Sequence, residues 1–150
     1  MQQIICFKER RYIEELRILT KSTAIDCIID DNFDRVIYII RKGDMGFAIG
    51  KRGENIRQMQ RVLGKRVEMV EEASDLNMFI GNILKPACLS SVSVDDESGK
   101  IKILVERKRD LGIAIGKGGS NVEKVRLLCK RFFGKDISDV LISGSDESEN

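Results

Sequence analysis

Two stretches of the 150-residue chain decide its architecture: MGFAIGKRGENI (Met45–Ile56) and LGIAIGKGGSNV (Leu111–Val122). They start 66 positions apart (111 − 45), and seven of the twelve aligned positions hold the same residue. Both copies contain the run Ala-Ile-Gly-Lys-x-Gly-x-Asn without a gap. A match of this length indicates that the chain contains an internal duplication.

The flanks of the two copies predict the same succession of elements: an opening helix, two strands joined by a turn, the glycine loop, a helix and a closing strand. Glycines at the ends of the helices that follow the loops fit C-terminal caps, and the second of these helices should be about one turn longer. In the first half we expect the elements at 6–20, 24–30, 35–42 and 65–70, with the glycine-loop helix ending at Gly64. In the second half we expect them at 75–85, 89–96, 100–108 and 136–142, with the corresponding helix ending at Gly134.

The repeat divides the chain into a domain at 1–72, a domain at 73–142 and an acidic tail at 143–150 that we expect to be disordered. The junction is short and lacks Gly and Pro, so we expect the two domains to keep a fixed mutual orientation. The offset of 66, applied to the strands as well, places Val36, Tyr38 and Ile40 on the sheet face away from the core. Such an apolar face would need cover from the second domain or from a partner. The alternative is that these residues form an edge of the local core.

Positive charge is concentrated around the two glycine loops, although the formal net charge is only +2. Residues 35–66 hold 9 Lys and Arg against 2 acids, and residues 100–135 hold 11 against 3. A partner with repeating negative charge would fit this distribution. Solvated helix faces of mixed charge remain the alternative.

Several classes of function do not fit the sequence. The four cysteines are widely spaced and there is no His, so we expect reduced thiols and no metal site. The second loop lacks the Ser or Thr of a nucleotide-binding P-loop, and no dinucleotide fingerprint or catalytic constellation is present. We therefore expect a protein that is not an enzyme and uses no cofactor. We also expect a cytoplasmic protein, because no apolar run is long enough for a membrane span and the N-terminus is too charged for a signal peptide.

The glycine loops combine four properties that suit a single-stranded nucleic acid. Glycine permits a positive φ and a close approach of a ligand, and the start of the following helix favours an anion. Lys and Arg add positive charge. Aliphatic side chains on both sides of each loop offer a surface for bases. The competing interpretation is that the glycines have only a structural role and form a turn. The recurrence of the Lys in both loops argues against it.

This layout resembles the K-homology (KH) family in its type II order, in which the extra helix and strand come first in the domain. In this family the glycine loop is a GxxG motif that binds about four nucleotides. The resemblance covers about residues 1–142. It implies an α+β fold of two tandem type II KH domains, each with a three-stranded mixed sheet packed on helices. A tandem of this kind is similar to archaeal NusA-like transcription termination factors. That similarity implies binding of single-stranded RNA during termination, antitermination or elongation.

The resemblance also implies RNA polymerase or the elongation complex as a partner. The sequence shows neither the polymerase-binding domain nor the additional RNA-binding barrel of bacterial NusA, which leaves the polymerase contact open. We expect a monomer. A second hypothesis is a KH scaffold in which one domain binds RNA and the other docks a protein, for example in ribosomal RNA processing. The candidate RNA-binding residues are Ile49, Gly50, Lys51, Arg52, Gly53, Asn55, Ile56, Arg57, Ile115, Gly116, Lys117, Gly118, Gly119, Asn121 and Val122.

Overall fold

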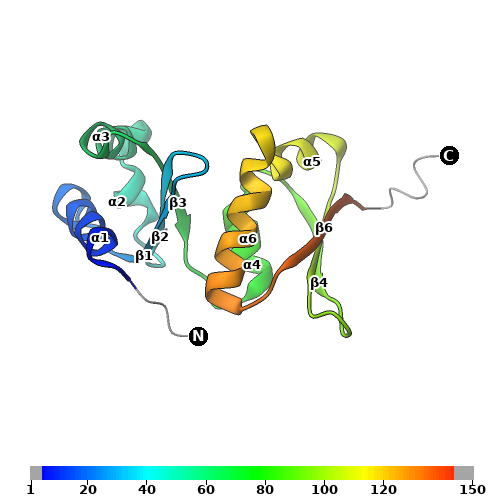
Figure 1. Cartoon of the computed structure of the whole chain (residues 1–150). Helices are drawn as coiled ribbons and strands as arrows, with labels where there is room; N and C mark the ends of the chain where they lie inside the picture. The colour runs from blue at the N-terminus through cyan, green and yellow to red at the C-terminus, as the bar shows by residue number, and fades with distance from the viewer. Residues whose placement is uncertain (1–4, 144–150) are drawn as a thin grey trace. The chain divides into compact units, whose positions relative to one another are not determined.

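The computed structural model describes residues 5–143, which form two compact units, one ending at Ala73 and the other beginning at Ser74. Each unit contains one three-stranded sheet with a set of helices (Figure 1). From residue 144 onward, the acidic tail predicted from the sequence lies outside the described residues.

The first unit consists of a mixed three-stranded sheet whose helices lie on one face (Figure 1). Strand β2 is central, antiparallel to β1 and parallel to β3. A parallel pair requires a crossover connection, and here α2 and α3 supply it. The elements are α1 (Phe7–Thr20), β1 (Ala24–Asp30), β2 (Arg35–Ile40), α2 (Met45–Ile49), a 3-10 turn (Lys51–Gly53), α3 (Glu54–Leu63) and β3 (Arg66–Glu71).

The core of the first unit lies between this sheet and its three helices. Met59 of α3 and Ala48 of α2 are fully buried there, as is Leu16 of α1. The hydroxyl of Tyr38 donates a hydrogen bond of 2.8 Å to the carbonyl of Tyr12 and so ties β2 to α1. The strand residues of the same cluster are Ala24, Cys27, Val36, Tyr38, Ile40 and Val67.

The prediction that Val36, Tyr38 and Ile40 face away from the core is therefore wrong. These residues belong to the core cluster, and strand alternation places Ile37 and Ile39 on the opposite face. All residues of β2 are buried, so burial alone does not separate the two faces.

The error has a specific cause, which the hydrogen bonds at the ends of the strands reveal. The N–H of Arg41 bonds the carbonyl of Thr23, and the N–H of Glu106 bonds that of Cys88. These two bonds occupy the same place in the two units, so Arg41 corresponds to Glu106 and Thr23 to Cys88. Both correspondences give an offset of 65 residues (106 − 41 and 88 − 23), whereas the glycine loops are offset by 66. The second unit thus has one extra residue between its central strand and its loop. A slip of one residue exchanges the two faces of a strand.

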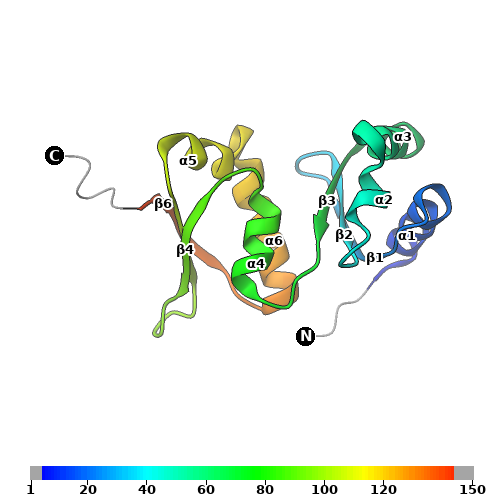
Figure 2. The ribbon, with the colours of Figure 1, turned by 180° about the vertical axis from the view of Figure 1, so that it is seen from behind.

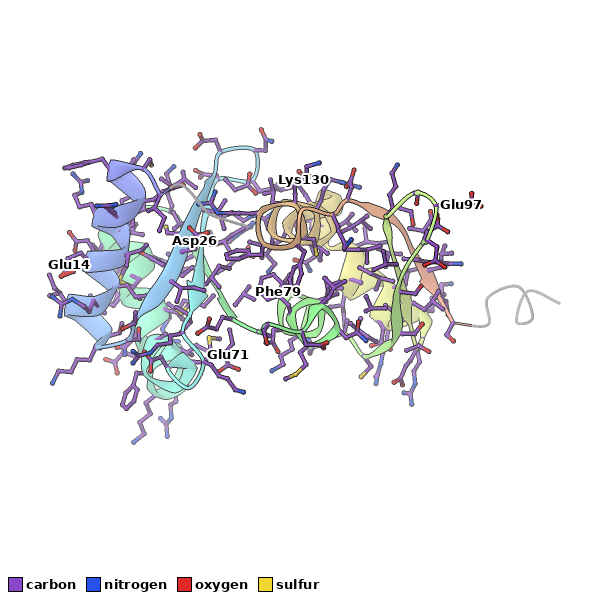
Figure 3. The ribbon with its side chains drawn as sticks, turned by 90° about the horizontal axis from the view of Figure 1, so that it is seen from below. Glu14, Asp26, Glu71, Phe79, Glu97 and Lys130 are labelled. Carbon is purple, nitrogen blue, oxygen red and sulfur yellow. The ribbon has the colours of Figure 1, made fainter. Side chains whose placement is uncertain are left out.

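The second unit repeats the same topology, with β5 central, antiparallel to β4 and parallel to β6. Figures 1 and 2 show α4 and α6 side by side on one face of the sheet. In Figure 3 Phe79 points from α4 towards α6, where its ring lies 5.5 Å from that of Phe132 and 5.8 Å from that of Phe133. The elements are α4 (Leu76–Leu84), β4 (Leu89–Val94), β5 (Ile101–Val105), α5 (Lys108–Ile115), a 3-10 turn (Lys117–Gly119), α6 (Ser120–Phe133) and β6 (Ile137–Ile142).

The structure confirms the α+β fold class and the predicted order of elements, with one addition. A short helix, α2 or α5, precedes each glycine loop. The patterns there are too short to show helical periodicity, and each helix contains a glycine, which lowers helix propensity. The predicted caps are correct, since Gly64 and Gly134 end their helices with φ of 67° and 66°. The second of these helices is also longer, at 14 residues against 10.

Candidate nucleic-acid interface

The first glycine of each loop holds a backbone conformation that other residues rarely adopt. Gly50 has φ 78° and ψ 170°, and Gly116 has φ 76° and ψ 168°. A Cβ on Gly50 would lie 2.8 Å from the backbone nitrogen of Asn55, and one on Gly116 would lie 2.8 Å from that of Asn121. Both glycines are therefore required by conformation and by packing.

The last glycine of each loop is the N-cap of the next helix and supplies no side-chain cap to it. Gly53 and Gly119 are left-handed, with φ of 74° and 79°, and no side chain caps α3 or α6. By contrast, α4 has Asp75 as its N-cap, whose carboxylate accepts a 2.9 Å hydrogen bond from the N–H of Met78. The N–H groups of Glu54 and Ser120, the first of α3 and α6, donate to the carbonyls of Lys51 and Lys117. The N-cap glycines offer no side-chain acceptor to the N–H groups that follow, and the helix dipole there favours an anion.

The residues between the glycines are exposed and project from both loops. Arg52 is left-handed, with φ 56°, and its counterpart Gly118 has φ 64°. In the first loop the guanidinium of Arg57 donates a 2.6 Å hydrogen bond to the carbonyl of Arg52, which supports the strained turn from the following helix. Lys51 and Lys117 occupy the same position in the two turns.

The two asparagines predicted as ligands also hold the loops in place. Asn55 donates from Nδ2 to the carbonyl of Phe47 at 2.8 Å, and Asn121 donates from Nδ2 to that of Ile113 at 2.7 Å. Each bond connects the helix after the loop to the helix before it. Part of the hydrogen-bonding capacity of each asparagine is therefore used inside the protein.

Two aspartates that the sequence analysis did not select anchor the loops to the sheets. Asp44 accepts a 2.8 Å hydrogen bond from the N–H of Thr23. Asp110, only 2% exposed, accepts bonds from the N–H groups of Cys88 and Arg107, both at 3.1 Å. Each aspartate stands six residues before the first glycine of its loop (50 − 44 and 116 − 110). This recurrence was the sequence signal that could have identified them.

The predicted aliphatic flanks are partly accessible in both units. Ile49, Ile56 and Val122 are half-buried, and Ile115 is 39% exposed. Ile56 also packs against the core of the first unit. Each loop is therefore bordered by apolar surface, and in the first unit that surface is continuous with a fixed core, as a base-binding surface requires.

Other kinds of site find no support in the described part of the chain. Among residues 5–143, no three His, Cys, Asp or Glu side chains gather closely enough to hold a metal ion. Over the same residues, no helix combines the length and the apolar character needed to cross a membrane. None of the four cysteines, all within the described residues, forms a disulfide; Cys6 and Cys88 are exposed, and Cys27 and Cys129 are buried.

Comparison with protein families supports the interpretation of the fold. A KH domain family matches residues 9–87, and a family described as the NusA-like second KH domain matches residues 76–131. Together these matches include both glycine loops.

Known proteins resemble the chain over most of its length. A probable transcription termination protein NusA from Halococcus morrhuae is 35% identical over 130 residues, which cover 87% of this chain and 91% of the relative. Its counterpart from Halobacterium salinarum is 35% identical over 134 residues, covering 89% and 94%. A solved structure, described as "Crystal structure of APE1850", superposes with a TM-score of 0.78 at 35% identity and covers 92% of this chain and 99% of that one.

Proposed function

This chain belongs to the NusA-like family of KH-domain proteins, which is non-enzymatic, and on that basis we propose that it binds single-stranded RNA through both glycine loops. The RNA backbone lies against the loops, and bases lie against the half-buried aliphatic side chains beside them. The middle residues Lys51, Arg52 and Lys117 supply positive charge to the phosphates.

The observation that carries this proposal is the matching, open geometry of the two loops. Both have a helix start without a side-chain cap, next to an exposed Lys. Both are held by the same Asn bond from behind. A loop that served only as a turn would not need a basic residue and an uncapped helix end in each copy.

The names of the relatives point to the biological process. Proteins called probable transcription termination protein NusA match this chain over most of their own length. We therefore place the RNA binding in transcription, at termination, antitermination or elongation, with nascent RNA as the ligand and the elongation complex as the setting.

The scaffold hypothesis is less well supported. It requires one of the loops to have lost its ability to bind RNA. The φ and ψ angles of the two loops differ by only a few degrees at the first glycine, and neither loop contains an acidic residue between its glycines. These features favour two working RNA sites.

A direct test replaces both middle residues by Asp in one loop at a time: Lys51→Asp with Arg52→Asp, and Lys117→Asp with Gly118→Asp. Filter binding with a labelled single-stranded RNA and its duplex form should show preference for the single strand in the unmodified protein. Each double variant should lower the slope of log K against log salt by about 0.7 for every phosphate that the protein no longer neutralises.

Arg10→Asp with Arg11→Asp on α1 is the matched control, because both residues are exposed and adjacent and the change in charge equals that of the first loop variant. The control should leave affinity nearly unchanged. One silent loop variant would favour the scaffold, and two silent variants would refute RNA binding by the loops.

A further inference from the structure

The exposed surface of α3 carries positive charge away from the first glycine loop. Arg57 and Arg61 stand one turn apart, and Lys65 follows four residues later, just beyond the helix cap. We call these three residues the basic track. Residues three and four positions apart lie on the same face of a helix, so the track continues from Arg52 in the loop towards the C-terminal end of α3.

The track is costly for the fold and is not neutralised near the loop. Like charges four residues apart destabilise a helix by a few tenths of a kcal/mol. Within residues 5–143, no carboxylate lies within ion-pairing distance of Arg57 or Arg61. Lys65, at the far end of the track, is 3.5 Å from the carboxylate of Asp31 and is therefore partly neutralised.

A shallow, open depression of about 510 Å³ lies at the far end of the track. Two of its lining residues, Gln60 and Gly64, lie three positions beyond Arg57 and Arg61 and so border the same helix face. Gln60 is fixed by a 3.1 Å hydrogen bond from the N–H of Val67 to its Oε1. The complete lining is Phe33, Asp34, Gln60, Gly64, Lys65 and Arg66.

The chemistry of this depression, which we call the Phe33 pocket, suits a base better than a phosphate. Its cations are partly neutralised, since Arg66 pairs with Glu68 at 3.2 Å and Lys65 pairs with Asp31. Phe33 lines the pocket, and the guanidinium of Arg35 covers one face of its ring at 4.9 Å from the centroid, which leaves the other face for a base. Base–aromatic stacking is a common and sequence-tolerant element of single-strand recognition.

The length of α3 separates the Phe33 pocket from the first glycine loop. Helix α3 has 10 residues, so at 1.5 Å per residue it extends about 15 Å. A strand that reaches the pocket must therefore continue past the nucleotides held at the loop, and the cations of the track lie along that path.

The second unit does not repeat this arrangement. With the loop offset of 66, Arg57 corresponds to Glu123 and Arg61 to Leu127. An acid and an apolar residue there would not guide a phosphate backbone. Lys65 corresponds to Arg131, so only the end of the track recurs, and the pair Arg57 and Arg61 is specific to the first unit.

We propose that the basic track and the Phe33 pocket form an additional RNA subsite that binds nucleotides of the same strand beyond those held by the first glycine loop. Arg57 and Arg61 contact phosphates, and a base enters the pocket against Phe33. The proposal rests on the RNA binding inferred above. It adds a length requirement to the first unit that the second unit lacks.

The test measures fluorescence anisotropy with fluorescein-labelled oligouridylates of four and eight nucleotides. The protein carries Lys117→Asp and Gly118→Asp, so that a longer strand gains nothing by reaching the second loop. In this background the eight-nucleotide RNA should bind at least about 25-fold more tightly than the four-nucleotide RNA, because the five registers of a four-nucleotide site contribute up to about fivefold and one stacked base contributes about fivefold more.

Two subsite variants are added to that background, Arg61→Gln and Phe33→Leu. Arg61→Gln should lower the salt slope by about 0.7 for the longer RNA only. Phe33→Leu should lower the gain from length to about fivefold. Lys130→Gln on α6 is the control, because it removes one exposed positive charge from the other unit (Figure 3).

The outcomes separate the subsite from the general function. If the longer RNA gains no more than about fivefold over the shorter one, or if the subsite variants behave like the control, the subsite is refuted while RNA binding by the loop stands. If neither RNA binds even to the unmodified protein, both proposals fail. Thermal unfolding of each variant verifies that Phe33→Leu leaves the first unit folded, and Arg61→Gln tests the track without changing the core.

Discussion

The first glycine of each loop offers the sharpest test of the structural argument, through replacement of Gly50 by Ala. At φ 78° and ψ 170°, a residue with a side chain costs about 1–3 kcal/mol. The new Cβ would also lie 2.7 Å from Cγ and 2.8 Å from the backbone nitrogen of Asn55. Because the backbone cannot yield easily, Asn55 must shift and weaken its bond to the carbonyl of Phe47, at a cost of about 1 kcal/mol.

The expected loss in the free energy of unfolding is therefore about 2–4 kcal/mol, a large part of the stability of a small domain. Urea unfolding followed by far-UV circular dichroism, without RNA, measures it. Gly116→Ala should behave similarly, because its Cβ would lie 2.8 Å from the nitrogen of Asn121.

A matched control lies four residues earlier in the chain. Gly46 and Gly112 are helical and have nothing within 4 Å of an added Cβ. The same Gly→Ala change there should stabilise the protein by about 0.5–1 kcal/mol, because Ala has the higher helix propensity. If Gly50→Ala and Gly46→Ala shift the unfolding midpoint alike, the assigned loop conformation is wrong.

Three further predictions follow from single residues. Gly118→Arg should lower the free energy of unfolding by about 1–2 kcal/mol, because it places a side chain at φ 64°. The reverse exchange, Arg52→Gly, should change the free energy of unfolding by less than about 1 kcal/mol. Equal effects of the two substitutions in thermal melts would contradict the backbone strain at these positions. Asp110→Ala should lower the free energy of unfolding by about 2–4 kcal/mol, because two backbone N–H groups lose their acceptor. A loss below about 1 kcal/mol in urea unfolding would show that water replaces the carboxylate. Burial raises the pKa of the Cys129 thiol to about 12. At a pH of about 8 a disulfide reagent should therefore label exposed Cys6 at once and Cys129 only in denaturant. Rapid labelling of Cys129 in the folded protein would disprove its burial.

The sequence alone was sufficient for the features that repeat. The ungapped match between the loops identified the duplication, the pattern of its flanks and the KH resemblance predicted the α+β fold, and the loop residues remain the predicted RNA contacts. This works because a glycine loop before a helix is a local structure, specified by residues that are neighbours in the chain. The caps at Gly64 and Gly134 were predictable for the same reason.

Only the tertiary structure decided which face of the first sheet carries the core and what holds the loops. One extra residue between β5 and the second loop exchanges the apparent faces of the strands, and no local pattern reveals it, because both faces of β2 are apolar. The anchoring of Asp110 to the N–H of Cys88 joins residues that are 22 positions apart (110 − 88). The Phe33 pocket likewise forms only when the β1–β2 turn folds against the end of α3. Such contacts depend on how the elements pack, and packing is a property of the whole domain rather than of any segment.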